Sequence, residues 1–248
     1  AKLDAIVAAI VAKGGGTAPM TADQMAAAIA NIPAGGIDII DGNLEITSLS
    51  LPHSRIRANV FMGCNMLQSI EFTAEEVYFG SEMCRSLTNL QSVTAPNATR
   101  IHGVGNEFNY CQGLTNIDLP IDYLSSTFSD CSGLISFVDR FVHPNGFKTQ
   151  IQSAALSGCT HLVTIDFYNG VSIGPWTISG CTALTNLVLR HNSVSELQAT
   201  AAFAGSTKFN DKTASIWVPD GLVESYKAAT NWSTYADIIK PLSEYVEA

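Results

Sequence analysis

SGCTALTNLVL, residues 179–189, repeats a phrase that occurs earlier as SGCTHLVTIDF at 157–167 and as YCQGLTNIDL at 110–119. In each copy a leucine follows the cysteine by three residues, and a second large apolar residue follows it by six. Apolar and polar residues alternate at the end of the phrase, as they do in a β-strand with one buried face. The repeated phrase therefore predicts one strand per repeat.

The phrase accounts for every cysteine in the chain. Successive cysteines are 20, 27, 20, 28 and 22 residues apart, and a degenerate seventh copy carries Ser206 in the cysteine position. These spacings lie in the range of leucine-rich repeats. A single unit cannot bury its own apolar edge, so neighbouring units must stack into a solenoid. We expect an α/β repeat solenoid, a right-handed leucine-rich repeat of mostly β coils with short N-terminal helices and a C-terminal helical cap.

A second apolar position precedes each cysteine by seven to ten residues and is expected to anchor the return segment of the coil. The residues at this position are Ile56, Val77, Ile101, Leu124, Ile151 and Ile173.

The cysteines themselves are expected to be structural core, because each occupies the same phase of the coil beside the leucines. They are Cys64, Cys84, Cys111, Cys131, Cys159 and Cys181. Free cysteine is among the most buried residue types. Disulfide pairing is the alternative, since equivalent positions of adjacent coils lie within disulfide range. No Cys-x-x-Cys or Cys/His pair has metal-ligand spacing, so we expect no metal site.

The two ends of the chain differ from the repeats, and we expect four parts. Residues 1–33 form an N-terminal helical appendage, 34–43 a linker into the first coil, 44–218 the solenoid and 219–248 a helical cap. A last strand is expected at 216–218, followed by a helix capped by Asp220. A cluster of aromatic residues is expected to seal the open end of the solenoid, although it could instead hold a sugar: Trp217, Tyr226, Trp232 and Tyr235.

Composition argues against several classes of function. The net charge is −9 with 14% charged residues, which disfavours nucleic acid as a partner. No uninterrupted apolar stretch is long enough to insert into a membrane. The chain contains no G-x-S-x-G, H-E-x-x-H or P-loop motif, and its five histidines have no metal-like spacing. We therefore expect no enzymatic activity, no catalytic residues and no cofactor.

The positions between the inward strand residues should face solvent and form a polar ladder. This ladder is the candidate binding face, since recognition uses exposed polar side chains held by a rigid scaffold. The alternative is a solvated sheet face with no specific role. The candidate residues are Ser69, Glu71, Asn116, Asp118, Thr164, Asp166 and Asn186.

The longer repeats contain insertions at 97–110 and 139–152, which in repeat arrays map to loops and often to the functional side. Phe141 and Phe147 could also fold back onto the edge of a coil. The candidate loop contacts are Arg100, His102, Phe141, His143, Phe147 and Lys148.

Residues 44–248 resemble the BspA-like branch of bacterial leucine-rich repeat proteins. The likeness lies in the F-x-G-C-x-x-L-x-x-I-x-L/F phrase and in IWVP followed by a YKAATNW helix. It implies a cell-surface or secreted bacterial protein that binds other macromolecules, often in adhesion. The ligand is then a protein or a glycan. The resemblance implies no catalytic residues, and no individual binding positions transfer because the shared motif is all core.

Residues 1–33 separately resemble a helix–Gly-rich–helix leader of phage and prophage tail-associated proteins, through AIVAKGGGTAPMTADQMAAAIANI. That likeness implies an alternative function as a structural or receptor-binding component of a phage particle. It also suggests oligomerisation through residues 1–33.

Overall fold

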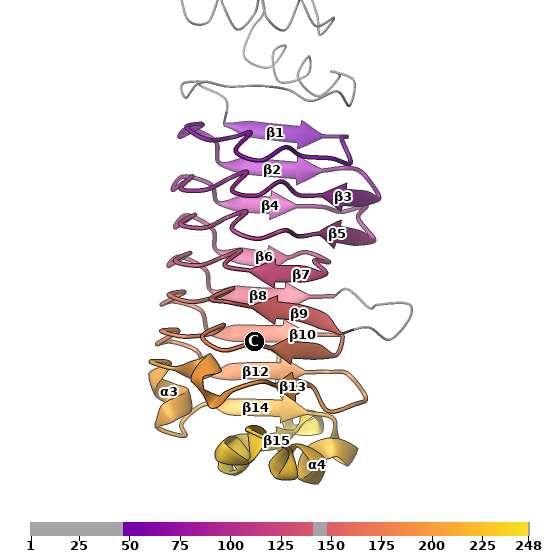
Figure 1. Cartoon of the computed structure of the whole chain (residues 1–248), viewed down its shortest axis with the longest axis vertical. Helices are drawn as coiled ribbons and strands as arrows, with labels where there is room; N and C mark the ends of the chain where they lie inside the picture. Colours follow the sequence, from indigo (N-terminus) through magenta and orange to yellow (C-terminus); the bar gives the residue numbers. More distant parts are fainter. Residues whose placement is uncertain (1–46, 141–147, 248) are drawn as a thin grey trace, which may run out of the picture.

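The computed structural model describes residues 47–140 and 148–247, and the expected appendage and linker lie outside them. The described chain forms a stack of coils, with one strand per coil along one side (Figure 1). These strands form two sheets, ordered β1-β2-β4 and β15-β14-β12-β10-β8-β6. Their bounds are β1 Ser48–Leu51, β2 Ser69–Phe72, β4 Ser92–Thr94, β6 Asn116–Asp118, β8 Ser136–Asp139, β10 Thr164–Phe167, β12 Asn186–Leu189, β14 Ser215–Val218 and β15 Ile239–Pro241.

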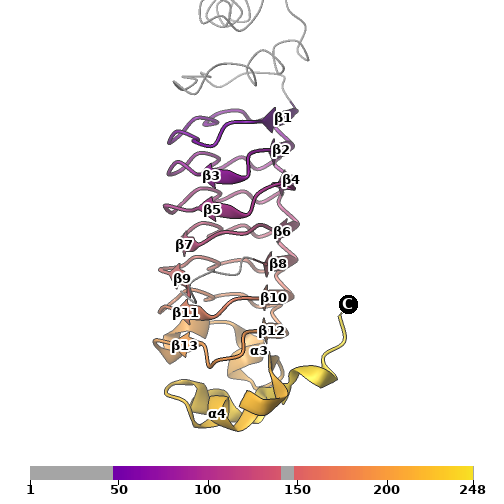
Figure 2. The ribbon, with the colours of Figure 1, turned by 90° about the vertical axis from the view of Figure 1, so that its right-hand side faces the viewer.

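Shorter strands line the other side of the stack (Figure 2). They form the sheets β3-β5 and β13-β11-β9-β7, and they contain five of the six residues that the sequence assigned to the return segment. Ile56 lies outside the strands and is partly buried. The bounds are β3 Glu76–Tyr78, β5 Arg100–His102, β7 Tyr123–Ser125, β9 Thr149–Gln152, β11 Val171–Ile173 and β13 Glu196–Leu197.

Adjacent strands of each sheet are parallel, and they place equivalent residues of successive coils side by side. Ile165 of β10, for example, pairs with Phe137 of β8 and Leu187 of β12. Neighbouring strands lie about 4.8 Å apart, so each coil repeats the side chains of the last at that interval. A residue type that suits one coil therefore suits the same phase of the next, which explains the repetition in the sequence.

The interior is filled by the repeated leucines and by a column of phenylalanines. Phe108 and Phe128 stack with ring centroids 5.3 Å apart, and Phe128 meets Phe137 at 5.6 Å. Phe79, five residues before Cys84, joins the column 5.5 Å from Phe108. Aromatic pairs at these separations add to the stabilisation that burial provides.

All six cysteines are free and buried in this core. Several thiols donate to a carbonyl of the preceding coil: Cys131 Sγ lies 3.0 Å from Phe108 O, and Cys181 Sγ lies 3.1 Å from Leu156 O. Ser206 repeats the contact, with its Oγ 2.5 Å from Ile178 O. Burial raises the pKa of Cys64 to about 11 and that of Cys181 to about 12. The thiols are therefore protonated at neutral pH.

In each regular coil the backbone turns at a residue with a positive φ, the left-handed conformation, five positions before the cysteine. Asn59, Asn106, Ser126 and Ala154 have φ of 57°, 62°, 49° and 57° at this position. Trp176 occupies it in the last such coil with φ 61°, and its side chain is exposed. A bulky residue pays a steric penalty there that asparagine largely avoids.

The chain after β12 alternates short helices with strands. Tyr226 and Trp232 are buried, and both bind the backbone of Ser195: Tyr226 Oη accepts from its N–H at 2.8 Å, and Trp232 Nε1 donates to its carbonyl at 2.8 Å. The helices are η1 Thr200–Phe203, α3 Thr207–Asn210, η2 Asp220–Leu222, α4 Val223–Ala228, η3 Trp232–Ile238 and η4 Leu242–Glu244.

Three details of this segment differ from the sequence predictions. Pro219, not Asp220, precedes the first helical turn, and the Asp220 carboxylate instead accepts from the Ser243 N–H at 3.0 Å. Trp217 alternates with the inward Ile216 and Val218, so it lies on the outer face of the sheet and not with the buried aromatic residues. The strand β15 was not predicted from the sequence, and it extends the sheet beyond β14.

Candidate binding face

The outer side of the two sheets β1-β2-β4 and β15-β14-β12-β10-β8-β6 is called the strand face here. Its first row consists of hydroxyl and amide side chains, and its second row contains the carboxylates. Pairing within each sheet aligns both rows as the alternation predicted. The first row is Ser48, Ser69, Ser92, Asn116, Ser136, Thr164, Asn186 and Ser215, and the second is Ser50, Glu71, Thr94, Asp118, Val138, Asp166, Val188 and Trp217.

Side chains of the first row accept hydrogen bonds from neighbouring coils, one from within the row and one from Trp217 of the second row. Ser136 Oγ donates to Asn116 Oδ1 at 2.7 Å, and Trp217 Nε1 donates to Asn186 Oδ1 at 2.8 Å. In the second row Ser50 Oγ donates to a Glu71 oxygen at 2.9 Å. These contacts orient the polar groups before any ligand arrives, which lowers the entropy that binding must overcome.

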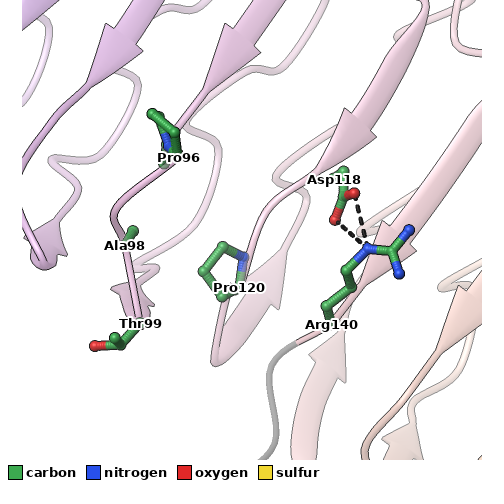
Figure 3. A pocket seen from close by; sticks show the side chains of 7 residues that line it. Pro96, Ala98, Thr99, Asp118, Pro120 and Arg140 are labelled. Carbon is green, nitrogen blue, oxygen red and sulfur yellow. Dashed lines mark hydrogen bonds and ion pairs between the residues drawn. The ribbon is translucent and has the colours of Figure 1, made fainter.

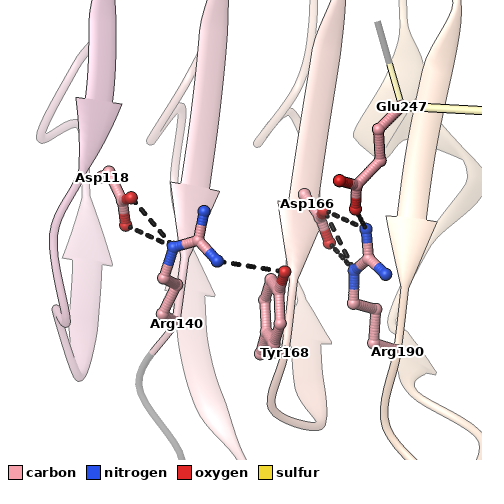
Figure 4. Close-up of polar contacts among 6 residues, drawn as sticks. All are labelled: Asp118, Arg140, Asp166, Tyr168, Arg190 and Glu247. Atoms are coloured by element: carbon pink, nitrogen blue, oxygen red, sulfur yellow. Dashed lines mark hydrogen bonds and ion pairs between the residues drawn. The ribbon is translucent and has the colours of Figure 1, made fainter.

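A third row follows the ends of the strands, and the sequence analysis missed it. Tyr168 lies between two guanidinium groups, with Arg140 Cζ 5.1 Å and Arg190 Cζ 4.9 Å from its ring centroid (Figure 4). Arg140 also donates to the Tyr168 hydroxyl at 3.1 Å. These residues stand two positions after the second row, so they share its parity. Extending the alternation two residues past each strand would have found them.

Each arginine of this row reaches back to an aspartate of the preceding coil. Arg140 Nε lies 2.9 Å from Asp118 Oδ2. Arg190 contacts Asp166 through both Nε and Nη2, at 2.9 and 2.8 Å. The hydrogen bonds with Asp166 raise the pKa of Arg190 above its ordinary value. Both predicted aspartates are therefore half of an ion pair, and they do not stand alone on the face.

The C-terminal residues cover one end of the strand face (Figure 2). The Tyr245 ring lies 5.4 Å from the Trp217 ring, and a Glu247 oxygen accepts from Arg190 at 2.5 Å. Asp166 and Val188 are buried. Burial also raises the pKa of Tyr245, with the Asp166 charge as a smaller cause.

A shallow depression of about 410 Å³ lies beside Asp118 and Arg140 (Figure 3). It forms where β4 and β6 belong to separate sheets. Pro96 and Pro120 each follow one of these strands and lack the N–H group that would continue a ladder. The depression is lined by Ala95, Pro96, Ala98, Thr99, Asp118, Pro120 and Arg140.

The predicted loop contacts are not brought together. Arg100 and His102 lie on β5, on the other side of the stack, and are not in a loop. The inward Ile101 between them fixes that strand in register with β3. Arg100 Nη2 lies 2.7 Å from Asp122 Oδ2, and the His102 nitrogens lie 2.7 Å from Glu76 and 3.0 Å from Asp122. The long spacing had suggested a loop, but these residues are part of the coil.

The other predicted loop contacts adjoin the second insertion. Phe141, His143 and Phe147 lie outside the described residues. Lys148 Nζ donates to the Val194 carbonyl at 3.3 Å, so its ammonium group is held against the coil edge.

A family model for the BspA type leucine-rich repeat region matches residues 41–139 and 135–218, with six copies. The chain belongs to this family. Its BspA-type phrase supplies the buried leucines and cysteines, so the residues that define the family are core and the strand face lies between them. This separation of core from face explains why family membership names no ligand.

Two solved structures show more distant likeness. A leucine-rich repeat protein of T. pallidum is 20% identical, with 56% of this chain and 78% of that chain covered and a TM-score of 0.36. A leucine-rich cell surface protein from Faecalibacterium prausnitzii A2-165 is 15% identical, with 79% and 78% covered and a TM-score of 0.23. Both likenesses are too low to add to the family assignment. The curated proteins contain no match.

Across residues 47–140 and 148–247, no three His, Cys, Asp or Glu side chains are grouped to hold a metal ion. Within the same residues, no helix is both long enough and apolar enough to cross a bilayer.

Proposed function

We propose that the protein recognises another macromolecule, a protein or a glycan, without enzymatic activity, and that it does so in adhesion at a bacterial cell surface. The binding surface is the strand face, with Ser69, Glu71, Asn116, Asp118, Thr164 and Asn186 among its contacts. The predicted contact Asp166 is left out, because its side chain is buried and paired with Arg190. The observation that carries the proposal is the hydrogen bonding of these rows across coils, from Ser136 to Asn116 and from Trp217 to Asn186.

A purely solvated face would not need this order. Parallel sheets usually have both faces covered by other elements. Here one face lies against the core and the other presents polar groups in fixed rows. Family membership supports a surface role, since the BspA resemblance implies surface proteins that bind macromolecules. The proposal retains the right-handed winding and the capping role of residues 219–248 that the sequence predicts.

The test is binding of the fluorescently labelled chain to a panel of intact bacterial cells and immobilised surface glycans. A strand-face variant, Asn116→Arg, places one bulky cation on an exposed position of β6. The matched control is Gln150→Arg, an exposed position of β9 on the other side. We expect the strand-face variant to lose binding and the control to keep it. Equal binding by both variants would overturn the assignment of the face.

A phage tail component is the second candidate function, and the sequence likeness of residues 1–33 favours it. Sedimentation of the full chain and of a chain lacking residues 1–33 tests it. Loss of an oligomer on removal of these residues, together with tail genes beside this one, would support a phage particle over a bacterial surface.

A further inference from the structure

The strand face contains the same pair of residues twice, two coils apart. Asp118 on β6 pairs with Arg140, and Asp166 on β10 pairs with Arg190. We call these the first and second Asp–Arg units. Tyr168 lies between them and contacts both arginines (Figure 4). The two units thus have the same chemistry, and their surroundings can be compared directly.

The second unit binds a side-chain carboxylate from the C-terminal residues of the same chain. Glu247 binds Arg190 Nη2, while the Tyr245 ring lies 5.9 Å from the same guanidinium and packs on Trp217. The Arg190 and Asp166 side chains are only 21% and 10% exposed. An acidic residue two positions after an aromatic one, in an extended segment, therefore suits this unit.

The first unit is open. The Arg140 and Asp118 side chains are 56% and 54% exposed. Within the described part of the chain, Arg140 contacts Asp118 through Nε and Tyr168 through Nη1. The corresponding Nη2 of Arg190 is the atom that binds Glu247. The first unit also adjoins the depression walled by Pro96 and Pro120 on its β4 side (Figure 3), whereas the aromatic residues Trp217 and Tyr245 lie on the β14 side of the second unit.

We infer that the first Asp–Arg unit and its depression bind an acidic peptide segment of a partner protein. A carboxylate of the segment pairs with Arg140, as Glu247 pairs with Arg190, and a neighbouring aromatic side chain packs against the two prolines. Planar guanidinium groups bind carboxylates in this way and still keep a second partner. The inference rests on the proposed function, since it names a ligand for part of the same face.

A peptide fits the observations better than an acidic sugar does. Among the described residues, the second unit is occupied by a peptide segment, the C-terminal residues that carry Glu247. The depression walls include two alanines and two prolines, which give an aromatic side chain apolar contact beside the polar groups of Thr99, Asp118 and Arg140. An acidic oligosaccharide is therefore an outcome of the test and not the proposal.

The test uses the full chain, labelled with ¹⁵N, and the synthetic peptide LSEYVEA with an amidated C-terminus, which copies residues 242–248. Binding is followed at low salt through the backbone amide signals of Thr99 and Asp118, which every variant keeps, and in the wild type also through the Nε–Hε signal of Arg140. We expect saturable binding that weakens at least about fivefold, near 1 kcal/mol, with Arg140→Gln and with a peptide carrying Gln in place of its last Glu. The Arg190→Gln chain should keep the binding.

Three results would overturn the inference. In the first, the peptide binds only through Arg190, by displacing the chain's own C-terminal residues. In the second, the peptide with Gln in place of its last Glu binds as tightly as the original. In the third, a uronic acid oligosaccharide binds through Arg140 and the peptide does not. Cell binding separates this inference from the proposed function. If the Arg140→Gln chain and the wild type bind cells equally while the peptide fails, only the peptide site is wrong.

Discussion

Raising the pH above 9 should unfold this protein through its cysteines. Burial raises the pKa of Cys64 to about 11 and the pKa values of Cys111 and Cys181 to about 12. Burial also raises the pKa values of Cys84, Cys131 and Cys159 well above their ordinary value. Above pH 9 the folded chain therefore holds thiol protons that the unfolded chain releases.

The sign and size of the effect follow from proton linkage. The unfolded state binds fewer protons, so the free energy of unfolding falls as pH rises. The stability is fully present below the unfolded pKa of about 9 and is lost as the pH approaches the folded values. Each thiol contributes about 1.4 kcal/mol per pH unit once the pH is well above 9. Six thiols together lower stability by about 5 kcal/mol between pH 8 and 9.5, which is a large part of a typical domain's stability.

The assay is urea unfolding followed by circular dichroism at pH 7.5, 8.5, 9.5 and 10 in the presence of a reductant. The variant Cys181→Ser removes one titrating group, and Ser206 shows that the coil accepts a hydroxyl in this position. We expect that variant to lose about 0.8 kcal/mol less than the wild type by pH 9.5. A free energy of unfolding that stays constant up to pH 10 would refute the reasoning, as would an identical loss in the variant.

Three further predictions concern the same scaffold. Thiol titration of the denatured, unreduced protein should find six reactive thiols, and fewer than six would indicate disulfides. The native protein should react slowly and first at Cys64, which is 4% exposed while the other cysteines are fully buried. Phe128→Ala should cost about 3–5 kcal/mol in urea unfolding, because it leaves a cavity in the phenylalanine column, and Phe128→Leu, which refills most of that volume, should cost much less. Equal costs would show that the aromatic ring itself, and not the buried volume, stabilises the column. Trp176→Asn should raise the stability measured by thermal unfolding by up to about 1 kcal/mol, because asparagine adopts the left-handed backbone conformation of this position more easily than tryptophan does. Ala154→Asn makes the same change at the equivalent position of another coil and is the matched control. A loss of stability would show that the exposed indole makes stabilising contacts.

The repeating part of the fold was predictable from the sequence because each coil must bury the same residues. The spacing of cysteine and leucine located the strands, and the alternation around Ile117, Ile165 and Leu187 located the two rows of the face. These are local patterns, and parallel stacking multiplies them. The family match confirms the BspA-type resemblance.

The missed features depend on contacts that local patterns do not contain. Arg190 meets Glu247 across 57 positions of sequence, so no window of repeats could connect them. Trp217 was assigned to the end of the solenoid because of its size. Its place between the inward residues Ile216 and Val218, in the alternation along the strand, puts it on the strand face instead. Arg100 and His102 were expected in a loop because a 27-residue repeat is long, yet their strand β5 matches β3 and β7 of the 20-residue repeats and is part of every such coil. Parity is therefore a better guide than repeat length for placing a side chain.

The uniform strand spacing makes the strand face a molecular ruler. The two Asp–Arg units are two coils apart, which is about 10 Å, or roughly three residues of an extended peptide. Inserting one whole coil between them would lengthen that interval by about 4.8 Å without altering either unit. Duplication of the gene segment for a single coil thus changes the distance between the charged units. Chains of this architecture can therefore diverge in the spacing of the ligand groups that they bind, while the interior stays the same.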